Sequence, residues 1–375
     1  MIPTGHPHLV VAALSHPGET GKNNEDCFSV TSYHLEADGT PALLALVTDG
    51  IGGHRAGEVA ARLTADTIVR SLAESSGQDP VPQLKAAVID AARAVSRSAQ
   101  ESPDRAGMGS TAAVAWIIGP RLYAVYVGDS RIYLLRHGEL RQVSVDHTWV
   151  QEAIDHGVIA PEEARNHPHA HVLRRHLGGQ LEPQPDTRLR LSPDESDEQA
   201  EANQGVSLDP GDQILLCSDG LTDLVQDGEM EDILLSSTPA AAAQALIDLA
   251  RSRGGFDNIT AIVMALPVPA RRRSARGCLL PLAAALAGGT ALVALVTLGL
   301  ALIWQLGYWP WSAGGAPPTL GPSPTAASAQ METQAALTPT LIQGSPSTTP
   351  LPSVTVAPTA TFTPIPLPTV PIGTP

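Results

Sequence analysis

The chain has 375 residues, a formal net charge of −15 and 3% aromatic residues. This acidic balance argues against a nucleic-acid partner, because phosphate backbones are bound by basic surfaces. The length allows about two or three structural units. The cysteines at 27, 217 and 278 are widely spaced, form no metal-binding or disulfide pattern and fit a reducing compartment.

The first elements lead through a short acidic turn to a buried strand. Strands are expected at 9–14 and 27–33, and the polar turn between them ends in two acids. Residues 42–47 form an unbroken apolar run, which predicts a strand buried on both faces. Asp49 and Gly50 follow where this strand surfaces. A carboxylate there, followed by bare glycine backbone, suits a hard cation such as Mg²⁺ or Mn²⁺.

Strands and helices alternate along the rest of the folded part. After Arg55, the residues Ala61, Ala65, Ile68 and Leu72 recur at helical spacing. The other elements expected from the pattern are helices at 81–100 and 239–252 and strands at 112–118, 121–127, 213–217 and 259–265. The acidic stretch 194–201 is expected to be a solvated loop. Strand runs interleaved with helices predict an α+β fold with helices packed on antiparallel sheets.

Four acids share one context in this pattern. Asp49, Asp129 and Asp219 each follow an apolar strand, and Asp257 directly precedes one; Asp26 is a fifth candidate. A single Asp-Gly is usually an ordinary turn, but its repetition at strand ends favours a cation site. Clustered carboxylates repel one another, and a divalent cation removes that repulsion. Two such ions about 4 Å apart can drive in-line displacement at phosphorus.

These motifs, taken together and in order, resemble those of the metal-dependent protein phosphatases, the PPM or type 2C serine/threonine phosphatases, in their short bacterial form. The resemblance covers about residues 9–266. The matching stretches are 24–26 (NED), 47–58 (VTDGIGGHRAGE), 107–111, 127–133 (VGDSRIY), 146–147, 208–223 (LDPGDQILLCSDGLTD) and 254–260 (GGFDNIT). The resemblance implies an αββα sandwich of two antiparallel sheets flanked by helices.

The resemblance also implies a set of metal-binding residues, which are Glu25, Asp26, Asp49, Gly50, Asp129, Asp219 and Asp257. Asp49 would bridge two Mg²⁺ or Mn²⁺ ions, with the Gly50 carbonyl on the second. Asp219 and Asp257 would bind the first ion, and they complete the catalytic set with Asp49. Glu25 and Asp26 would act through metal-bound waters, and Asp129 would help to hold a third, looser metal. The nucleophile would be the hydroxide between the two main ions.

Two positions depart from the family pattern. Many members hold the substrate phosphate with an arginine where this chain has Gly21, and the neighbouring Lys22 is the candidate substitute. Lys22 can act as a point charge but not as a bidentate fork. Some relatives carry a histidine proton donor where this chain has Ile51, so the proton donor stays unassigned. His54 is an alternative donor, although a polar residue at a helix start fits it better.

Three alternating histidines, His167, His169 and His171, lie in the polar segment 147–180, which matches the family's mobile flap. They suggest a zinc site at first sight. Their spacing fits no structural zinc pattern. A solvated flap loop is therefore the favoured interpretation.

The composition of the chain changes after residue 267. A phosphatase domain at 1–267 is expected to be followed by a basic juxtamembrane linker at 268–277, a transmembrane helix at 278–306 and a disordered Pro/Thr/Ser-rich tail at 307–375. The arginines of the linker precede the span, and no basic residue follows it. The positive-inside rule then places the catalytic domain in the cytoplasm and the tail outside.

The sequence thus predicts a membrane-anchored phosphoserine/phosphothreonine protein phosphatase that uses two Mg²⁺ or Mn²⁺ ions and opposes a Ser/Thr kinase on that kinase's phosphorylated substrates. Two alternatives stay open. One is a catalytically silent phosphoprotein-binding module tethered at the membrane, and the other is a phosphatase of small phosphoesters.

Overall fold

The structure, a computed structural model, describes residues 1–52, 55–179, 183–268 and 293–307. The chain divides into two compact units, Met1–Ala275 and Arg276–Pro375. All predicted site residues belong to the first unit, and the alternative proton donor His54 in that unit lies outside the described residues.

Two antiparallel sheets form the centre of the first unit, as far as the structure describes it. The six-stranded sheet has the order β1-β3-β4-β7-β8-β11, with bounds Ile2–Thr4, Cys27–His34, Pro41–Thr48, Ala112–Ile118, Arg121–Val127 and Val206–Ser207. The five-stranded sheet has the order β10-β9-β12-β13-β2, with bounds Glu139–Gln142, Arg131–Arg136, Gln213–Cys217, Ile259–Ala265 and Val10–His16. A short pair, β5 (Gly50–Ile51) and β6 (Gly109–Ser110), lies beside the site.

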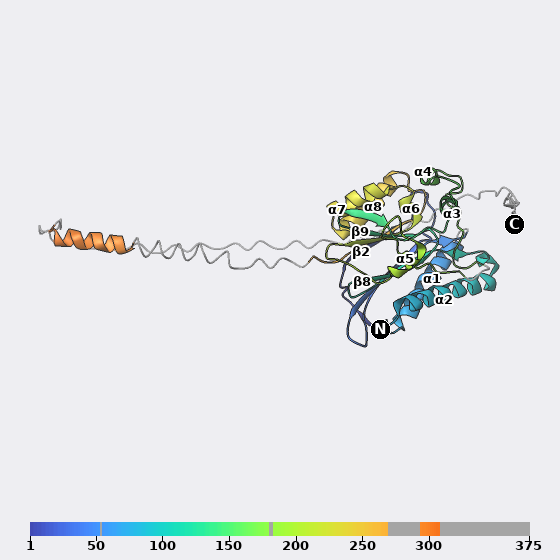
Figure 1. Ribbon diagram of the computed structural model, residues 1–375, viewed down its shortest axis with the longest axis horizontal. Helices are drawn as coiled ribbons and strands as arrows, with labels where there is room; N and C mark the ends of the chain where they lie inside the picture. Colours follow the sequence, from blue (N-terminus) through green and yellow to red (C-terminus); the bar gives the residue numbers. More distant parts are fainter. Residues whose placement is uncertain (53–54, 180–182, 269–292, 308–375) are drawn as a thin grey trace, which may run out of the picture. The chain divides into compact units, whose positions relative to one another are not determined.

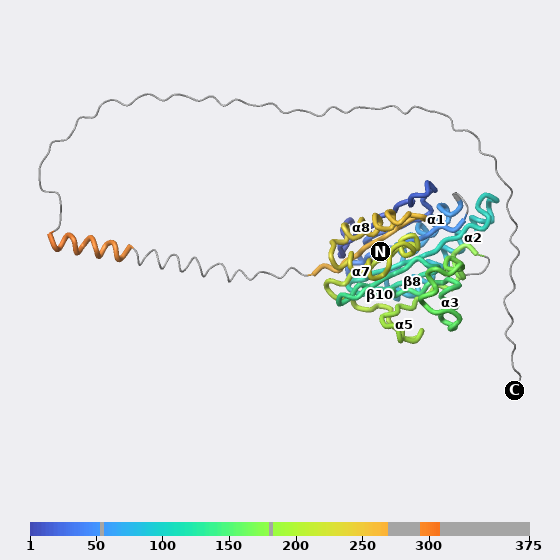
Figure 2. The backbone as a smooth tube through the Cα atoms, turned by 90° about the horizontal axis from the view of Figure 1, so that it is seen from above, coloured from blue at the N-terminus to red at the C-terminus, as the bar shows by residue number. Residues whose placement is uncertain are grey.

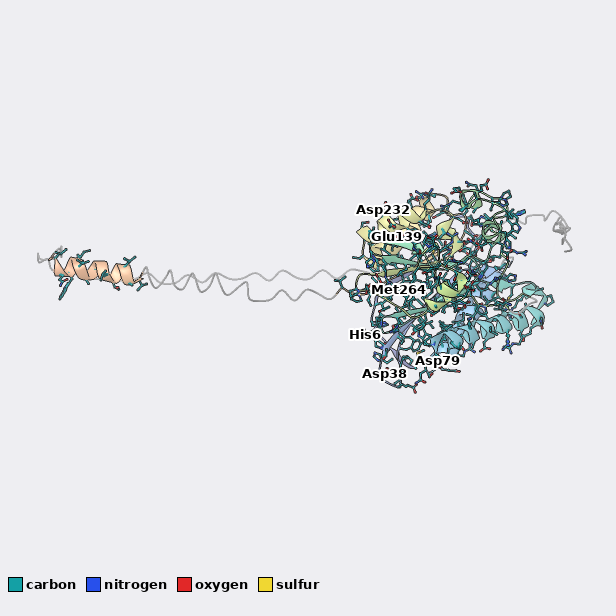
Figure 3. All side chains as sticks on the ribbon, in the orientation of Figure 1. His6, Asp38, Asp79, Glu139, Asp232 and Met264 are labelled. Atoms are coloured by element: carbon teal, nitrogen blue, oxygen red, sulfur yellow. The ribbon has the colours of Figure 1, made fainter. Side chains whose placement is uncertain are left out.

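Helices cover the outer face of each sheet (Figure 1). Helices α1 (Arg55–Ala73) and α2 (Pro80–Glu101) share a core with the six-stranded sheet. Helices α7 (Asp227–Ser236) and α8 (Pro239–Ser252) share a core with the five-stranded sheet. In Figure 3 the exposed side chains of Asp232 on α7 and Asp79 before α2 lie on opposite sides of the unit, with Met264 of β13 between them. The tube in Figure 2 follows the same elements from above. The predicted α+β fold with two antiparallel sheets and flanking helices is confirmed.

The strand β4 shows why the apolar run lacks alternation. Leu43, Ala45 and Val47 pack between the two sheets, whereas Leu44 and Leu46 pack under α1 and α2. Successive side chains of a strand point to opposite faces. Because both faces are covered, positions 42–47 are all apolar, and the strand holds the residue that follows it, Asp49, in a fixed place.

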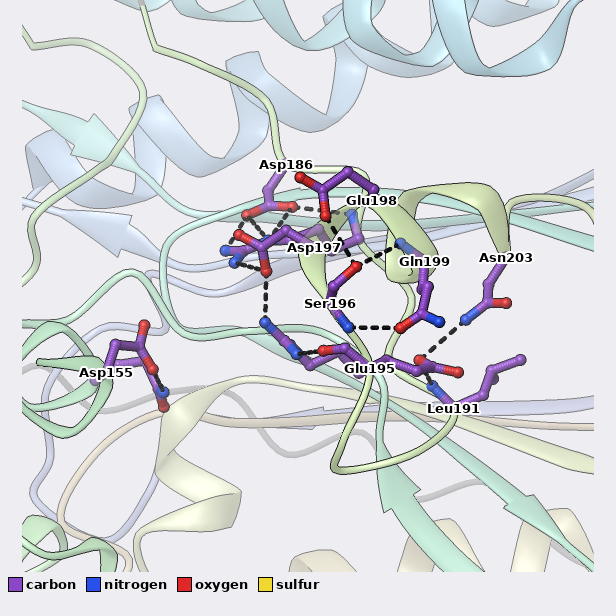
Figure 4. Close-up of polar contacts among 12 residues, drawn as sticks. Asp155, Asp186, Leu191, Glu195, Ser196, Asp197, Glu198, Gln199 and Asn203 are labelled. Carbon is purple, nitrogen blue, oxygen red and sulfur yellow. Dashed lines mark hydrogen bonds and ion pairs between the residues drawn. The ribbon is translucent and has the colours of Figure 1, made fainter. Parts of the chain in front are cut away.

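Several short helices lie between the long elements, and one of them contradicts a prediction. The stretch 194–201, predicted as a loop, contains most of α5 (Asp197–Ala202), so that prediction is wrong. Ser196 Oγ accepts a hydrogen bond from Gln199 N at 3.3 Å, and Gln199 Oε1 accepts one from Ser196 N at 2.9 Å (Figure 4). This reciprocal capping box starts a helix despite its charge. The remaining short helices are α3 (Trp149–Asp155), α4 (Pro161–Ala164), α6 (Asp219–Thr222) and the 3₁₀ turn Pro103–Arg105.

In the second unit the structure describes a helix over 293–305. Within the described part of the chain, no helix is both long and apolar enough to cross a membrane. The first half of the predicted span, 278–292, the linker from 269 and the tail from 308 lie outside the described residues.

Candidate metal centre

Carboxylates from both sheets converge at one end of the sandwich. Asp49 follows β4, Asp219 follows β12 as the first residue of α6, and Asp257 precedes β13. Burial raises the pKa of Asp49 well above its usual range, and the charges of Asp26, Asp219, Asp129 and Asp257 raise it further. The structure therefore brings together all five carboxylates of the predicted aspartate cluster.

Asp26 is held by two hydroxyl groups from the other sheet. Its Oδ2 accepts hydrogen bonds from Ser218 Oγ at 2.7 Å and from Thr260 Oγ1 at 2.6 Å. Burial raises the pKa of Asp26 to about 6, although these two hydroxyls act to lower it. Sequence reasoning did not single out Ser218 or Thr260; each lies next to or within a quoted motif, and that proximity is the signal that could have found them.

Asn258 ties the acidic turn to this centre. Its Oδ1 accepts a hydrogen bond from Glu25 N at 2.7 Å, and its Nδ2 donates to the carbonyls of Pro17 and Asn23, each at 3.1 Å. Backbone groups from distant parts of the sequence thus meet at one side-chain amide. Asn258 was not predicted as a site residue, yet it positions Glu25.

The glycines after Asp49 permit a close approach of backbone and carboxylate. A Cβ on Gly57 would lie 2.1 Å from Glu25 Oε2 and 2.7 Å from the Gly50 carbonyl oxygen. A Cβ on Gly50 would lie 2.2 Å from the Gly57 carbonyl oxygen. Only bare backbone fits here, so the Gly50 carbonyl and the Glu25 carboxylate lie against the first turn of α1, where the sequence predicted metal ligands.

A cavity of about 420 Å³ is lined by Asp129 and Asp219 and also by residues of the flap segment, among them Arg165 and His171. Arg165 of the flap donates to the carbonyls of Thr222 and Val225 at 2.5 and 3.2 Å. These contacts hold the flap segment against the helix α6 that begins at Asp219.

The three flap histidines do not form one site. His167 stacks on the ring of Trp149 with centroids 4.8 Å apart, and His169 meets the same ring edge-on at 5.0 Å. His171 instead points to the acids, with Nδ1 3.5 Å from Asp223 Oδ2 and 3.9 Å from Asp219 Oδ2. The sequence placed His171 in the flap but did not predict its approach to Asp219, because that approach depends on the fold of the flap.

The residues present fit a hard divalent cation. Asp26 Oδ1 and Asp219 Oδ1 are buried and, among the described residues, have no hydrogen-bond partner. Buried carboxylate oxygens are normally paired. A cluster of oxygen donors with unpaired atoms is the donor set that Mg²⁺ and Mn²⁺ prefer.

The candidate phosphate-binding residue lies on an exposed loop. Lys22 makes no hydrogen bond or ion pair with any other described residue. Gly21 beside it has a φ of +73°, and a Cβ on Gly21 would have no atom within 4 Å. The role of Lys22 stays a prediction.

We expect Gly21→Arg to lower KM for a phosphopeptide, because space is available and a guanidinium binds phosphate through two hydrogen bonds. The positive φ costs a non-glycine residue about 1 kcal/mol, which the fold tolerates on an exposed loop. Gly21→Gln carries the same backbone strain without the charge and is the matched control. Lys22→Ala should raise KM. Unchanged KM values in both charge variants would show that the phosphate is held elsewhere.

Comparison with known proteins identifies the class to which this fold and site belong. Residues 17–251 match the family model described as protein phosphatase 2C, and the chain belongs to that family. The family prediction made from the motifs is confirmed.

The individual relatives are named as serine/threonine phosphatases. The serine/threonine protein phosphatase PstP of Mycobacterium tuberculosis is 40% identical over 255 residues, which are 68% of this chain and 44% of PstP. The serine/threonine phosphatase stp of Listeria monocytogenes is 34% identical over 62% of this chain and 88% of its own length. The chain thus spans less than half of the length of PstP.

Solved structures agree with the fold. A crystal structure of M. tuberculosis PstP/Ppp superposes with a TM-score of 0.58 at 36% identity, covering 69% of this chain and 99% of that one. The PstP catalytic domain in complex with two manganese ions gives a TM-score of 0.56 at 36% identity, covering 68% of this chain and 97% of that one.

Proposed function

We propose that this chain is a metal-dependent phosphoserine/phosphothreonine protein phosphatase. The observation that carries the proposal is the cluster of five aspartates whose buried oxygens on Asp26 and Asp219 have no partner among the described residues. The family, and the named activity of relatives such as PstP, support the same conclusion.

The chain's own residues would hold two Mg²⁺ or Mn²⁺ ions and a substrate phosphate. Asp49, the Gly50 carbonyl, Asp219 and Asp257 would bind the ions, and Glu25 and Asp26 would orient coordinated water. Two divalent cations, when bound, lower the pKa of water and neutralise charge on phosphate. The hydroxyls of Ser218 and Thr260 fix the Asp26 carboxylate, so its orientation is set before substrate arrives.

The direct test is phosphate release from a phosphothreonine peptide by the full chain and by residues 1–275. We expect release with Mn²⁺ or Mg²⁺ and none with EDTA. Binding of the peptide without release would favour the silent binding module. Hydrolysis of small phosphoesters alone would favour the third interpretation.

We also propose that the chain is anchored in the membrane with its phosphatase domain in the cytoplasm, where it opposes a Ser/Thr kinase. Residues 278–306 carry no charge, and Arg271, Arg272, Arg273 and Arg276 precede them. In the described helix 293–305 the large apolar side chains are exposed, including Leu295 at 67% and Trp304 at 78%. Charge bias at the ends of a span sets its orientation.

Protease added to intact spheroplasts that contain the protein should shorten it by roughly the tail, because only the tail is outside. The remaining fragment should stay membrane-bound and active. Detergent lysis before protease is the control, since it exposes both sides. Loss of the phosphatase domain in intact spheroplasts would reverse the proposed orientation.

A further inference from the structure

A buried histidine, His147, forms hydrogen bonds with the backbone of Gly128, the residue before Asp129. Its side chain is 3% exposed, and its ring Nδ1 accepts a hydrogen bond from Gly128 N at 3.1 Å. Its own backbone N–H donates to the Gly128 carbonyl at 2.9 Å. Both polar backbone groups of Gly128 are therefore bound by one residue that lies 19 positions later in the chain.

The backbone at Gly128 leaves no room for a side chain. Its φ is +104°, and a Cβ there would lie 2.6 Å from Thr111 Cγ2. Thr111 is itself tied to the metal centre, since its Oγ1 accepts from Asp49 N at 2.9 Å and pairs with Ser130 Oγ at 2.7 Å. The residues on both sides of Asp129 are thus fixed, by His147 before it and by Thr111 after it.

The ring of His147 is held in one tautomer. Since Nδ1 accepts, Nε2 carries the proton and donates to Asp186 Oδ2 at 3.2 Å. Arg188 donates to Asp186 through Nε and Nη2 at 2.6–3.1 Å and to Asp197 through Nη1 at 2.9 Å. Figure 4 shows Asp186 and Asp197 with the hydrogen bonds they accept. Burial alone would raise the pKa of Asp186, but the hydrogen bonds from His147 and Arg188 outweigh it, so the pKa is well below its usual range and the carboxylate stays ionised.

Asp129 depends on this support. Its side chain is buried, with 7% of the residue exposed, and no other side chain in the described part of the chain hydrogen-bonds to it. Its carboxylate lines the cavity beside Asp219, and its charge raises the pKa of that residue. The carboxylate hydrogen-bonds with its own backbone N–H, so its position follows that of the backbone.

We propose that His147 is a positioning residue that sets Asp129 for cation binding, with Asp186 and Arg188 fixing its ring. The inference rests on the proposed metal-dependent function. It extends that function by assigning a role to a buried histidine–aspartate pair that makes no contact with the predicted ligands themselves. Groups that orient metal ligands from outside typically change metal affinity by about 10- to 100-fold when they are replaced.

The test measures Mn²⁺ binding to the full chain by calorimetry in the absence of substrate. His147→Asn keeps an acceptor at the place of Nδ1, and His147→Gln keeps only a polar group at the place of Nε2. We expect His147→Gln to weaken the weakest Mn²⁺ step by about 10- to 100-fold and His147→Asn to stay within about threefold of the wild type. His8→Gln is the matched control, because His8 bonds the Gly119 carbonyl at 2.8 Å, at the opposite end of β7 from the site.

Each outcome decides the proposal. An equal loss of Mn²⁺ affinity in both variants would show that His147 has a merely structural role. Unchanged Mn²⁺ affinity in both would show that it has no role. A loss of affinity in His147→Asn alone would assign the effect to the contact with Asp186 instead. If His147→Gln does not fold, as judged by circular dichroism, His147→Ala replaces it, because it removes the same acceptor for Gly128 N, and unchanged Mn²⁺ affinity there overturns the proposal. A wild-type protein that binds Mn²⁺ but releases no phosphate from a phosphothreonine peptide defeats the proposed function alone.

Discussion

Asp219→Asn and Asp257→Asn should each reduce Mn²⁺-dependent phosphate release by roughly a thousandfold or more, because a ligand charge worth several kcal/mol is removed from the transition state. An amide keeps the shape of the side chain but is a neutral and weaker ligand for a hard cation. Asp219 Oδ1 is buried without a partner among the described residues, whereas Oδ2 lies 3.9 Å from His171 Nδ1, so Oδ1 is left to bind a cation. Turnover near that of the wild type at saturating Mn²⁺ would contradict the metal assignment.

The folded state should survive this change. Burial raises the pKa of Asp219 well above its usual range, and the charges of Asp129, Asp223, Asp257 and Asp26 add to the effect. Removing one charge from such a cluster relieves repulsion in the metal-free protein. Asp219→Asn should therefore have a Tm in EDTA no lower than that of the wild type. Asp232→Asn, an exposed substitution on α7, is the control and should leave both activity and Tm unchanged.

The metal-free protein should lose stability as the pH rises from 5 to 8, and Mn²⁺ should restore it. Burial is the main cause that raises the pKa of Asp26 to about 6 and that of Asp129 to about 7 in the folded state, from 3.8 in the unfolded chain. The folded state therefore keeps protons that the unfolded state releases. The resulting stabilisation is complete below pH 3.8 and is lost as the pH passes through about 6 and 7. Between pH 5 and pH 8 the loss is on the order of 4 kcal/mol, at about 1.4 kcal/mol for each pKa unit.

Melting curves at pH 5 and pH 8, each in EDTA and in Mn²⁺, check this expectation. The Mn²⁺ effect should be larger at pH 8, because protons compete with the ion at pH 5 and the ion binds only the folded state. His8, whose pKa is lowered mainly by burial, contributes a slope of opposite sign. The comparison is therefore made with the double variant Asp26→Asn, Asp129→Asn, whose slope should be flatter. The assignment would be contradicted if the Tm of the metal-free wild type fell no more between pH 5 and pH 8 than that of the double variant.

The elements that sequence reasoning found are those with strong local signals. The run 42–47 and the stripe Ala61, Ala65, Ile68 and Leu72 are buried as predicted, because apolar periodicity reflects burial directly. The short helix α5 was missed because a capping box, rather than an apolar face, starts it. Local chemistry of that kind carries no periodic signal.

In the candidate site, too, the residues with local sequence signals were predicted and the long-range contacts were not. The acids were predictable because strand ends lie at the rim of a sheet, where apolar runs give way to Asp and Gly. The hydrogen bonds that support them were not predictable, because they join residues that are far apart in the sequence. Thr260 reaches Asp26 across 234 residues, and His147 reaches Asp186 across 39. Such contacts depend on the register of strands and on loop paths, which single-chain patterns leave undetermined.

The pairing of β2 with β13 joins the first and last long strands of the domain, from Val10 opposite Ala265 to His16 opposite Ile259. A chain leaves the ribosome at about 5–20 residues per second, so β13 is synthesised on the order of 10–50 s after β2. During that interval Asp26 lacks Thr260, and Glu25 lacks Asn258. The metal centre is thus among the last parts of the domain to form. On the proposed function, a polypeptide that ends before residue 257 would lack Asp257, Asn258 and Thr260 and would release no phosphate.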